Sequence, residues 1–404
     1  MIPGALHPRH RIDIEPEALA RALGACVSAS ADSVSALEAL ACPAGEVIAT
    51  LSARSAFDLL LSALALPAGS EVILSAWTIP DMARIVRAHG LVPVPLDCRA
   101  DTLAPELQAL RDAISPRIRV AVIAQLFGAR AELAGFDALC RARGVLLIDD
   151  DAQGFVSLAR LREGSCADVT LHSFGSIKTA TALGGGLVRV RDEALRARMR
   201  QGMAAWPMQS RGRYARKVGS YLGLSALREP SRYGAFAHAV ERRGDSLDGV
   251  ITAAVKGFPS DSPEALLRAI RSRPCDALCA TMREAIAGCD PARVSRRREA
   301  GERLRARLEG VEVLGDAMPE RTHWLFAVLS RSPASLVAAL RRAGFDGARG
   351  TSTITALEPS PERPEMRAVT CERWPPRMVF LPAYPEIPES ERDRMAEVVR
   401  SHER

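Results

Sequence analysis

From about residue 45 to residue 190, short apolar segments rich in Val, Ile and Leu alternate with helical patterns. This alternation is typical of a parallel sheet whose strands are connected by helices. The expected strands are EVILS (71–75), LVPVPLD (91–97), RVAVIAQ (119–125), VLLIDD (145–150), DVTLHSF (168–174) and GGLVRVR (185–191). Helices are expected between them at 55–66, 81–89, 105–114 and 133–143. We therefore expect an α/β fold with a mainly parallel central sheet and helices on both faces.

The pattern changes after Asp192, where arginine-rich helical stretches extend to about residue 305. The last hundred residues contain two strand candidates, THWLFAVLS and RMVFLPAYP, a helix at 335–343 and a charged helix from Glu389, which together indicate a small α+β domain. We expect three parts: an N-terminal segment at 1–45, a large domain at 46–290 and a small C-terminal domain at 291–404.

Composition excludes several classes of protein. The apolar runs, such as 56–66, are much shorter than the roughly 20 residues of a membrane span, so no transmembrane segment is expected. The first residues contain no apolar core of a secretory signal, which favours the cytoplasm. The nine cysteines are scattered and have no nearby histidine partners, so neither a metal site nor a disulfide framework is expected. The net charge of +6 comes almost entirely from arginine, because the chain contains only three lysines: Lys178, Lys217 and Lys256.

Lys178 follows a strand end in DVTLHSFGSIKTATALGGG (168–186), and a run of glycines leads into the next strand. Ligands of open α/β sheets bind outside the carboxyl ends of the strands, and glycines let the backbone approach them. A partly buried lysine beside a cationic group keeps a neutral amine that can condense with an aldehyde. The alternative is a surface lysine in a glycine-rich turn.

Two further segments carry chemistry at the same predicted edge. In VLLIDDDAQ (145–153), an apolar strand runs into three aspartates, one of which could hold a protonated ring nitrogen of a cofactor; metal binding or solvation of the strand end is the alternative. In ATLSARSAFDLLLSALAL (49–66), hydroxyl residues precede an amphipathic helix whose N-terminus, near Arg54 and Ser55, could bind a phosphate. Helix capping alone by Ser52 or Ser55 is the alternative there.

In order along the chain, the segments SARSA, GSEVILSAWT, GLVPVPLDCRADTL, FGARAEL, LIDDDAQG, HSFGSIKT with the following GGG, and LPAYP resemble the DegT/DnrJ/StrS family of aminotransferases. These enzymes depend on pyridoxal 5'-phosphate (PLP), have fold type I and act mostly on nucleotide-linked keto sugars. The resemblance implies that Lys178 forms the Schiff base, Asp150 pairs with the pyridine nitrogen and Gln153 lies near the phenolic oxygen. It also implies that Ser173, Arg54 and Ser55 bind phosphate, and that the chain forms a homodimer with shared active sites.

The chain departs from the family pattern around the substrate. The aromatic residue that usually follows the threonine matched by Thr78 is Ile79 here, and we expect Trp77 to substitute for it against the cofactor ring. Gly184 replaces a glutamate, and the usual His-Gly pair is represented by Gln201 and Gly202. His323 with Trp324, at the start of a predicted strand, and Arg349 are candidates for substrate binding.

The leading hypothesis is a PLP-dependent aminotransferase that moves an amino group from an amino-acid donor, such as glutamate, to a keto acceptor. One alternative is a PLP-dependent lyase or dehydratase, although dehydratases of the group commonly carry histidine at the lysine position. The other is a non-catalytic regulator that uses the basic stretch 206–243 to bind nucleic acid or anionic lipid. A solvated helical face is the simpler interpretation of that stretch, so no nucleic-acid partner is expected.

Overall fold

The computed structural model describes residues 4–11, 14–255, 257–258, 262–349 and 354–404. Its main element is a seven-stranded sheet with the strand order β1-β8-β7-β6-β5-β2-β4. Six of these strands run in the same direction, whereas β8 is antiparallel to both of its neighbours, β1 and β7. The strands are β1 (Val47–Thr50), β2 (Glu71–Ser75), β4 (Val92–Leu96), β5 (Ile118–Ala124), β6 (Leu146–Asp150), β7 (Val169–Ser173) and β8 (Gly186–Val190). The predicted mainly parallel sheet is confirmed.

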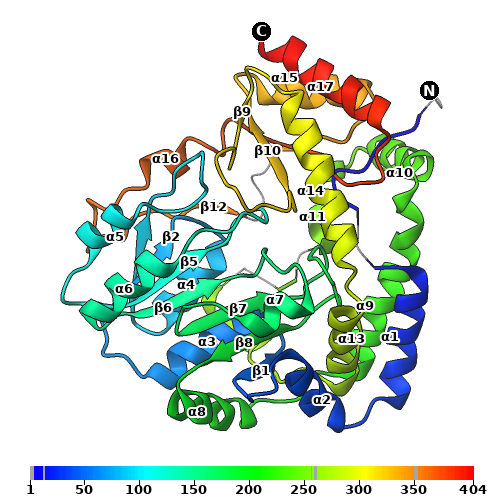
Figure 1. Cartoon of the computed structure of the whole chain (residues 1–404). Coiled ribbons are helices and arrows are strands. Elements are labelled where there is room, and N and C mark those ends of the chain that lie inside the picture. Colours follow the sequence, from blue (N-terminus) through cyan, green and yellow to red (C-terminus); the bar gives the residue numbers. More distant parts are fainter. Residues whose placement is uncertain (1–3, 12–13, 256, 259–261, 350–353) are drawn as a thin grey trace.

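Helices cover both faces of this sheet (Figure 1). Because successive strand residues point to opposite faces, Ile148 packs into the apolar cluster under α3 and α4, whereas Leu147 packs into the cluster formed with α5 and α6. The first face carries α3 (Ala53–Leu64), α4 (Pro80–Ala88), α8 (Glu193–Ala204) and α12 (Pro263–Ile270), and the second carries α5 (Leu107–Ala113) and α6 (Ala134–Arg143).

A second group of helices packs beside the β1–β8 end of the sheet. The apolar cluster there joins Leu19 of α1, Leu37 of α2, Tyr214 of α9 and Leu278 of α13 to Leu187 of β8. The bounds are α1 (Pro16–Ser28), α2 (Asp32–Ala41), α7 (Leu158–Glu163), α9 (Arg211–Leu224), α10 (Pro230–Arg242), α11 (Leu247–Val255) and α13 (Asp276–Ala287). The predicted helical nature of the stretch 192–305 is therefore confirmed.

The C-terminal elements form a smaller α+β layer, which lies at the top of Figure 1. Its four-stranded sheet has the order β11-β13-β10-β9, with β9 (Glu312–Val313), β10 (Phe326–Leu329), β11 (Ala348–Arg349) and β13 (Met378–Leu381). The accompanying helices are α14 (Pro291–Ala306), α15 (Pro333–Arg342), α16 (Val369–Glu372) and α17 (Glu389–Glu403). The short strand β12 (Thr355–Ala356) leaves this layer and pairs with β3 (Trp77–Thr78). The division of the chain at 45/46 and 290/291 stays a prediction.

Among the helices that the structure describes, none is long and apolar enough to cross a membrane.

Candidate functional site

The carboxyl ends of the parallel strands bring the candidate residues to one edge of the sheet. Strand β1 is antiparallel to β8, as is β7, so β1 runs in the same direction as β7 and its parallel neighbours. Ser52 follows β1, Asp150 ends β6 and Ser173 ends β7. The expectation that these residues share one edge is met, and this is the edge at which open α/β sheets bind ligands.

Lys178 lies in the loop that connects β7 to β8, and a backbone hydrogen bond of 3.0 Å from its N–H to the carbonyl of Gly175 holds the turn. Its Nζ atom lies 4.3 Å from the ring centroid of Trp324. Burial lowers the pKa of Lys178 to about 8; the nearby charge of Asp150 opposes this shift, and that of Arg54 adds to it. About a tenth of the amine is therefore neutral at pH 7, far more than for an ordinary lysine, and the neutral form is the one that reacts with an aldehyde.

Of the three consecutive aspartates, Asp150 is the one that interacts with Lys178. Its Oδ1 atom accepts a hydrogen bond of 3.2 Å from the Ala152 N–H, and burial raises its pKa, a shift that the charge of Lys178 opposes. A carboxylate in this state gains stability from a further cationic partner. Asp150 can therefore pair with a protonated ring nitrogen.

Asp149 and Asp151 belong to a different polar cluster, because neighbours in a strand point to opposite faces. Asp149 accepts a 2.8 Å hydrogen bond from Gln125 Nε2, and Asp151 accepts one of 2.7 Å from Arg130 Nη1. The His172 Nδ1 atom lies 3.2 Å from Asp151 Oδ2. Burial and the charge of Asp151 raise the pKa of Asp149, whereas His172 and Arg130 outweigh burial and lower the pKa of Asp151. His172 is thus buried, with its ring beside the Asp151 carboxylate.

The N-terminus of α3 lies against β8 at the same edge. A Cβ atom on Gly186 would lie 2.7 Å from the Ala53 backbone nitrogen, so only glycine permits this approach. Ser52 caps the helix, since its Oγ accepts a 3.1 Å hydrogen bond from the Ser55 N–H. The Ser55 hydroxyl donates a 2.7 Å hydrogen bond to the Ile270 carbonyl, so its proton already has an acceptor within the protein. The backbone N–H groups of Ala53 and Arg54 precede the first helical hydrogen bonds and can bind an anion.

Three other predicted residues lie around this edge. A Cβ atom on Gly175 would lie 3.7 Å from Ser173 Oγ and 3.9 Å from Lys178 Cγ, so the hydroxyl and the lysine stem flank the same side of this glycine. Gln153 Oε1 accepts a 2.8 Å hydrogen bond from the Phe127 N–H. The Arg54 Nε atom donates to Asp81 at 2.6 Å, which keeps the guanidinium beside the start of α3.

Three predicted residues lie away from this group. Trp77 is completely buried and packs edge to face against Trp374 at 5.4 Å, inside an apolar cluster, so it cannot present its ring to a cofactor. Thr78, its neighbour, pairs with Thr355 of β12. Arg349 is exposed and donates to the Pro376 carbonyl at 3.3 Å, outside the main cavity.

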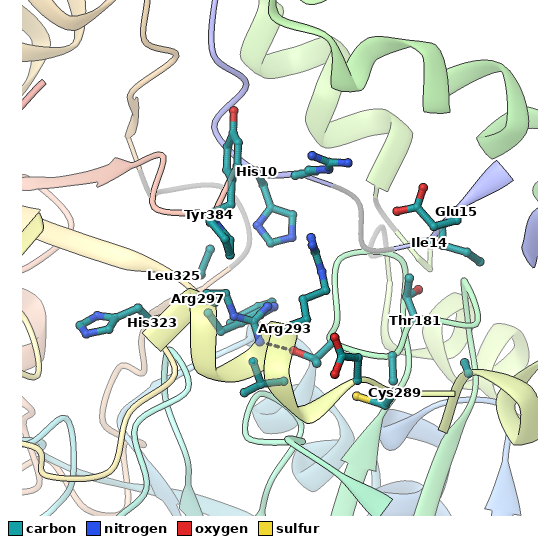
Figure 2. A pocket seen from close by; sticks show the side chains of 18 of the residues that line it. His10, Ile14, Glu15, Thr181, Cys289, Arg293, Arg297, His323, Leu325 and Tyr384 are labelled. Atoms are coloured by element: carbon teal, nitrogen blue, oxygen red, sulfur yellow. Dashed lines mark hydrogen bonds between the residues drawn. The ribbon is translucent and has the colours of Figure 1, made fainter. Parts of the chain in front are cut away.

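A cavity of about 310 Å³ adjoins the lysine loop. Its lining includes Thr179, which follows Lys178 in the sequence, and Trp324, whose ring contacts the lysine amine. Basic side chains enter it from the N-terminal segment and from α14, and Figure 2 shows His10, Arg293 and Arg297 among them. Five arginines line the cavity against three carboxylates: Arg9, Arg11, Arg21, Arg293 and Arg297 against Glu15, Glu284 and Asp290. Carboxylates outside the lining also pair with some of these arginines, Asp346 with Arg9 and Glu386 with Arg11 and Arg293. The lining therefore presents guanidinium groups to an anionic guest, which would share them with these carboxylates.

His323 lies at the margin of this cavity. Its ring stacks on Phe326 at a centroid distance of 5.3 Å, and its Nε2 atom lies 2.9 Å from Glu302 Oε1. Burial lowers its pKa to about 4, so the ring is neutral at physiological pH. These contacts give His323 a structural role, whereas Trp324, the next residue, is the one that reaches Lys178.

Sequence reasoning missed His10 and Arg297, which contact the two residues flanking Lys178. His10 Nε2 lies 3.0 Å from the Ile177 carbonyl oxygen, and Arg297 Nη2 donates to Thr179 Oγ1 at 2.9 Å. Both residues are remote from Lys178 in sequence and follow no recognisable spacing. Only the arrangement of the chain in space reveals them.

The basic stretch 206–243 does not combine its basic side chains with the exposed aromatic rings that binding to nucleic acid would use. Tyr221 is buried, Trp206 is partly buried, and Arg211 pairs with Asp276 at 2.8 Å. The aromatic rings are thus unavailable to stack on bases, which leaves the simpler interpretation of helices with a solvated basic face.

The group of residues at the sheet edge fits pyridoxal phosphate. A lysine amine of lowered pKa, a buried carboxylate, a helix N-terminus and the Ser173 hydroxyl match its aldehyde, its ring nitrogen and its phosphate. Within the described residues, no group of three or more His, Cys, Asp or Glu side chains could hold a metal ion.

Comparisons with known proteins agree with this chemistry. Residues 34–226 match the model of the DegT/DnrJ/EryC1/StrS aminotransferase family. Similar structures include a DegT DnrJ EryC1 StrS aminotransferase from Brucella abortus, with a TM-score of 0.68 and 18% identity over 96% of this chain and 94% of that one. The PseC aminotransferase of Helicobacter pylori has a TM-score of 0.68 and 14% identity over 99% of each chain. The E. coli GDP-4-keto-6-deoxy-D-mannose-3-dehydratase with bound hydrated PLP has a TM-score of 0.68 and 15% identity over 98% and 99%. The predicted fold, type I of the PLP enzymes, and the predicted PLP dependence are confirmed at the level of the family.

Proposed function

We propose that this chain, which belongs to the DegT/DnrJ/EryC1/StrS aminotransferase family through residues 34–226, transfers an amino group from an amino-acid donor to a keto acceptor. The observation that carries the proposal is Lys178, a partly buried amine whose pKa is lowered to about 8 and which interacts with Asp150. An amine of this kind serves both as a nucleophile toward an aldehyde and as an acid and base near neutral pH.

Different residues at the sheet edge hold different groups of the cofactor. In this proposal Asp150 binds the ring nitrogen, and Gln153 lies near the phenolic oxygen. Ser173 and the backbone N–H groups of Ala53 and Arg54 at the α3 N-terminus hold the phosphate, whereas Ser55 supports this turn through its bonds to Ser52 and Ile270. When bound, PLP supplies an aldehyde that captures amines and a ring that accepts an electron pair. Lys178 Nζ then takes a proton from the donor carbon and returns it to the acceptor carbon, while Asp150 keeps the ring nitrogen protonated.

The arginine-lined cavity is the proposed entrance for substrate. It shares Trp324 and Thr179 with the lysine loop, and Arg293 and Arg297 of α14 could hold carboxylate or phosphate groups. Glutamate is the proposed donor. The proposed acceptor class comprises nucleotide-linked keto sugars and other anionic keto intermediates of biosynthesis, because the excess of arginine selects for negative charge. We further propose that the enzyme acts in the cytoplasm as a homodimer.

Absorbance of the purified protein with added PLP tests this function. We expect a visible band that glutamate bleaches, with formation of 2-oxoglutarate, and we expect Lys178→Ala to lose both the covalent band and the turnover. Lys217→Ala is the matched control, because Lys217 lies in α9, outside the site. Turnover by Lys178→Ala at the wild-type rate would disprove the assignment of the lysine.

The alternative of a PLP-dependent dehydratase or lyase has support in the E. coli dehydratase, which shares the fold. An elimination needs no amino donor, whereas transamination needs one in stoichiometric amount. Product formation from a keto sugar without any amino donor would therefore favour the alternative, and product that appears only with a donor supports transamination.

A further inference from the structure

The two residues that flank Lys178, Ile177 and Thr179, are held by residues from other parts of the chain. Trp324 Nε1 donates to the Ile177 carbonyl at 2.9 Å, and His10 Nε2 lies 3.0 Å from the same oxygen. On the other side, Arg297 Nη2 donates to Thr179 Oγ1, the hydrogen bond drawn as a dashed line in Figure 2. The loop carrying the lysine is thus tied to the N-terminal segment and to α14.

Trp324 is the member of this group that also reaches the amine. It is 5% exposed, and its ring centroid lies 4.3 Å from Lys178 Nζ, a distance typical of a cation–π contact. The His10 ring lies edge to face against it at 6.1 Å. Trp324 therefore contacts the lysine segment in two ways. Its indole N–H binds the Ile177 carbonyl, and its ring lies against the Lys178 amine.

The position of Trp324 is itself fixed by close backbone packing. The Thr322 N–H donates to the Gly128 carbonyl at 2.9 Å, and a Cβ atom on Gly128 would lie 3.1 Å from Trp324 Cβ. Gly128 has φ +82°, a conformation that favours glycine. The preceding residue, Phe127, donates its N–H to Gln153. Trp324 thus connects the lysine loop to the Phe127–Gly128 turn, which in turn holds the side chain of Gln153, another predicted cofactor contact.

Charged groups around the amine act in opposite directions. Asp150 at the end of β6 favours the ammonium form, whereas Arg54 at the start of α3 disfavours it. The electron-rich face of an indole favours the ammonium form, and the effect is larger where water is excluded. The ring therefore acts together with Asp150 and against Arg54.

We propose that Trp324 is a positioning residue for Lys178, whose ring sets the place and the charge of the amine while its N–H holds the loop. As a statement about the cofactor-binding lysine, this inference rests on the proposed function. Its physical content concerns the free amine and can be measured without PLP.

Reductive methylation of lysine at a series of pH values tests the inference directly. Because the chain has only three lysines, peptide mass spectrometry resolves Lys178 from Lys217 and Lys256, the last of which lies outside the described residues. In Trp324→Leu we expect the midpoint of Lys178 labelling to fall by about one pH unit, so that labelling at pH 7 rises about fivefold. Trp324→Phe, which retains a ring, should show a smaller shift.

Trp374→Leu and Trp374→Phe are the matched controls, because Trp374 is an equally buried tryptophan that packs against Trp77 away from the lysine. We expect both to leave the Lys178 midpoint unchanged. An unchanged or raised midpoint in both Trp324 variants, or an equal shift in the Trp374 variants, would overturn the inference. If Trp324→Leu does not fold, Trp324→Phe still gives the answer.

Capture of PLP separates this inference from the proposed function. The Lys178 amine adds to the aldehyde carbon with loss of water, and borohydride then reduces the carbon–nitrogen double bond, so the product is countable by mass. Wild-type protein that captures no PLP on Lys178 contradicts the proposed function and leaves the methylation result standing. Capture by wild type and Trp324 variants at the same rate and with the same pH dependence contradicts the positioning role alone.

Discussion

Asp149, Asp150 and Asp151 are chemically identical and adjacent, yet their surroundings give them different protonation behaviour. Strand alternation directs Asp150 toward Lys178 and its neighbours toward Gln125, Arg130 and His172. The sequence alone predicted a functional carboxylate at this strand end, and only the family resemblance selected Asp150. The expectation that Trp77 packs against the cofactor ring was wrong. Its place next to Thr78 in the sequence does not show which side of the two-residue strand β3 faces the cofactor.

Substitution of Asp150 tests this difference. Asp150→Asn removes the charge that supports the Lys178 ammonium and the proposed ring nitrogen, so we expect amino transfer to fall on the order of 100-fold, as is typical for loss of one electrostatic contact to a developing charge. Single-turnover bleaching of the visible band by glutamate measures the rate. Asp149→Asn, the same change on the other face, should stay within a few fold of wild type. Equal losses in the two variants would contradict the assignment.

At the scale of elements, the large sheet was predictable because its strands are almost wholly buried. Strand β2 matches the expected 71–75, and β7 lies one residue inside the expected 168–174 at each end. The helices of 192–305 have no such signal, since arginine-rich amphipathic segments do not mark where one helix ends. Packing determines their limits instead. For example, Gly301 in α14 leaves room for the His323 ring, which would lie 2.3 Å from a Cβ atom at that position.

The contact between α14 and His323 predicts a pH-dependent stability. Burial lowers the pKa of His323 to about 4, below its usual 6.5, so the unfolded chain binds a proton first as the pH falls. We therefore expect the free energy of unfolding to decrease between about pH 6.5 and pH 4, by on the order of 2 kcal/mol. Urea denaturation at several pH values measures this.

His323→Phe, which keeps a ring on Phe326, should flatten the pH dependence in that window. The Glu302 carboxylate has a pKa lowered to about 2 by Arg321, His323 and Arg305 against the effect of burial. Its contribution is present above about pH 4.5 and is lost as the pH falls toward 2. A variant with the same slope as wild type between pH 6.5 and pH 4 would assign the effect to another group.

For the whole molecule, the cavity and the lysine edge are neighbours, and the arginine-lined cavity includes neither Lys178 nor Asp150 among its lining residues. In the proposed homodimer, a second copy of the chain would supply a further wall of the cofactor site at this edge. Neither the strand pattern nor the composition indicated this cavity, because its lining comes from the N-terminal segment, α13, α14 and the start of β10.

Light scattering during gel filtration tests the proposed dimer. We expect a mass of about twice the 43.4 kDa of one chain, both with and without PLP. Dilution that dissociates the dimer should reduce amino transfer in parallel, since the site would lose part of its enclosure. A monomer with full activity would show that one chain encloses the cofactor by itself.

The antiparallel direction of β8 affects where the protein can tolerate insertions and deletions. Because β7 and β8 are paired neighbours, with Ser173 opposite Gly186, the segment between them is a closed loop whose two ends are joined by the sheet. Its backbone amides bond inward, as those of Ala182 and Gly184 do to the Phe174 carbonyl. An added or deleted residue here cannot be absorbed by sliding a helix, as it could in a crossover connection, and would displace the lysine itself. We expect insertions and deletions to be tolerated less well in this loop than in any other connection of the sheet.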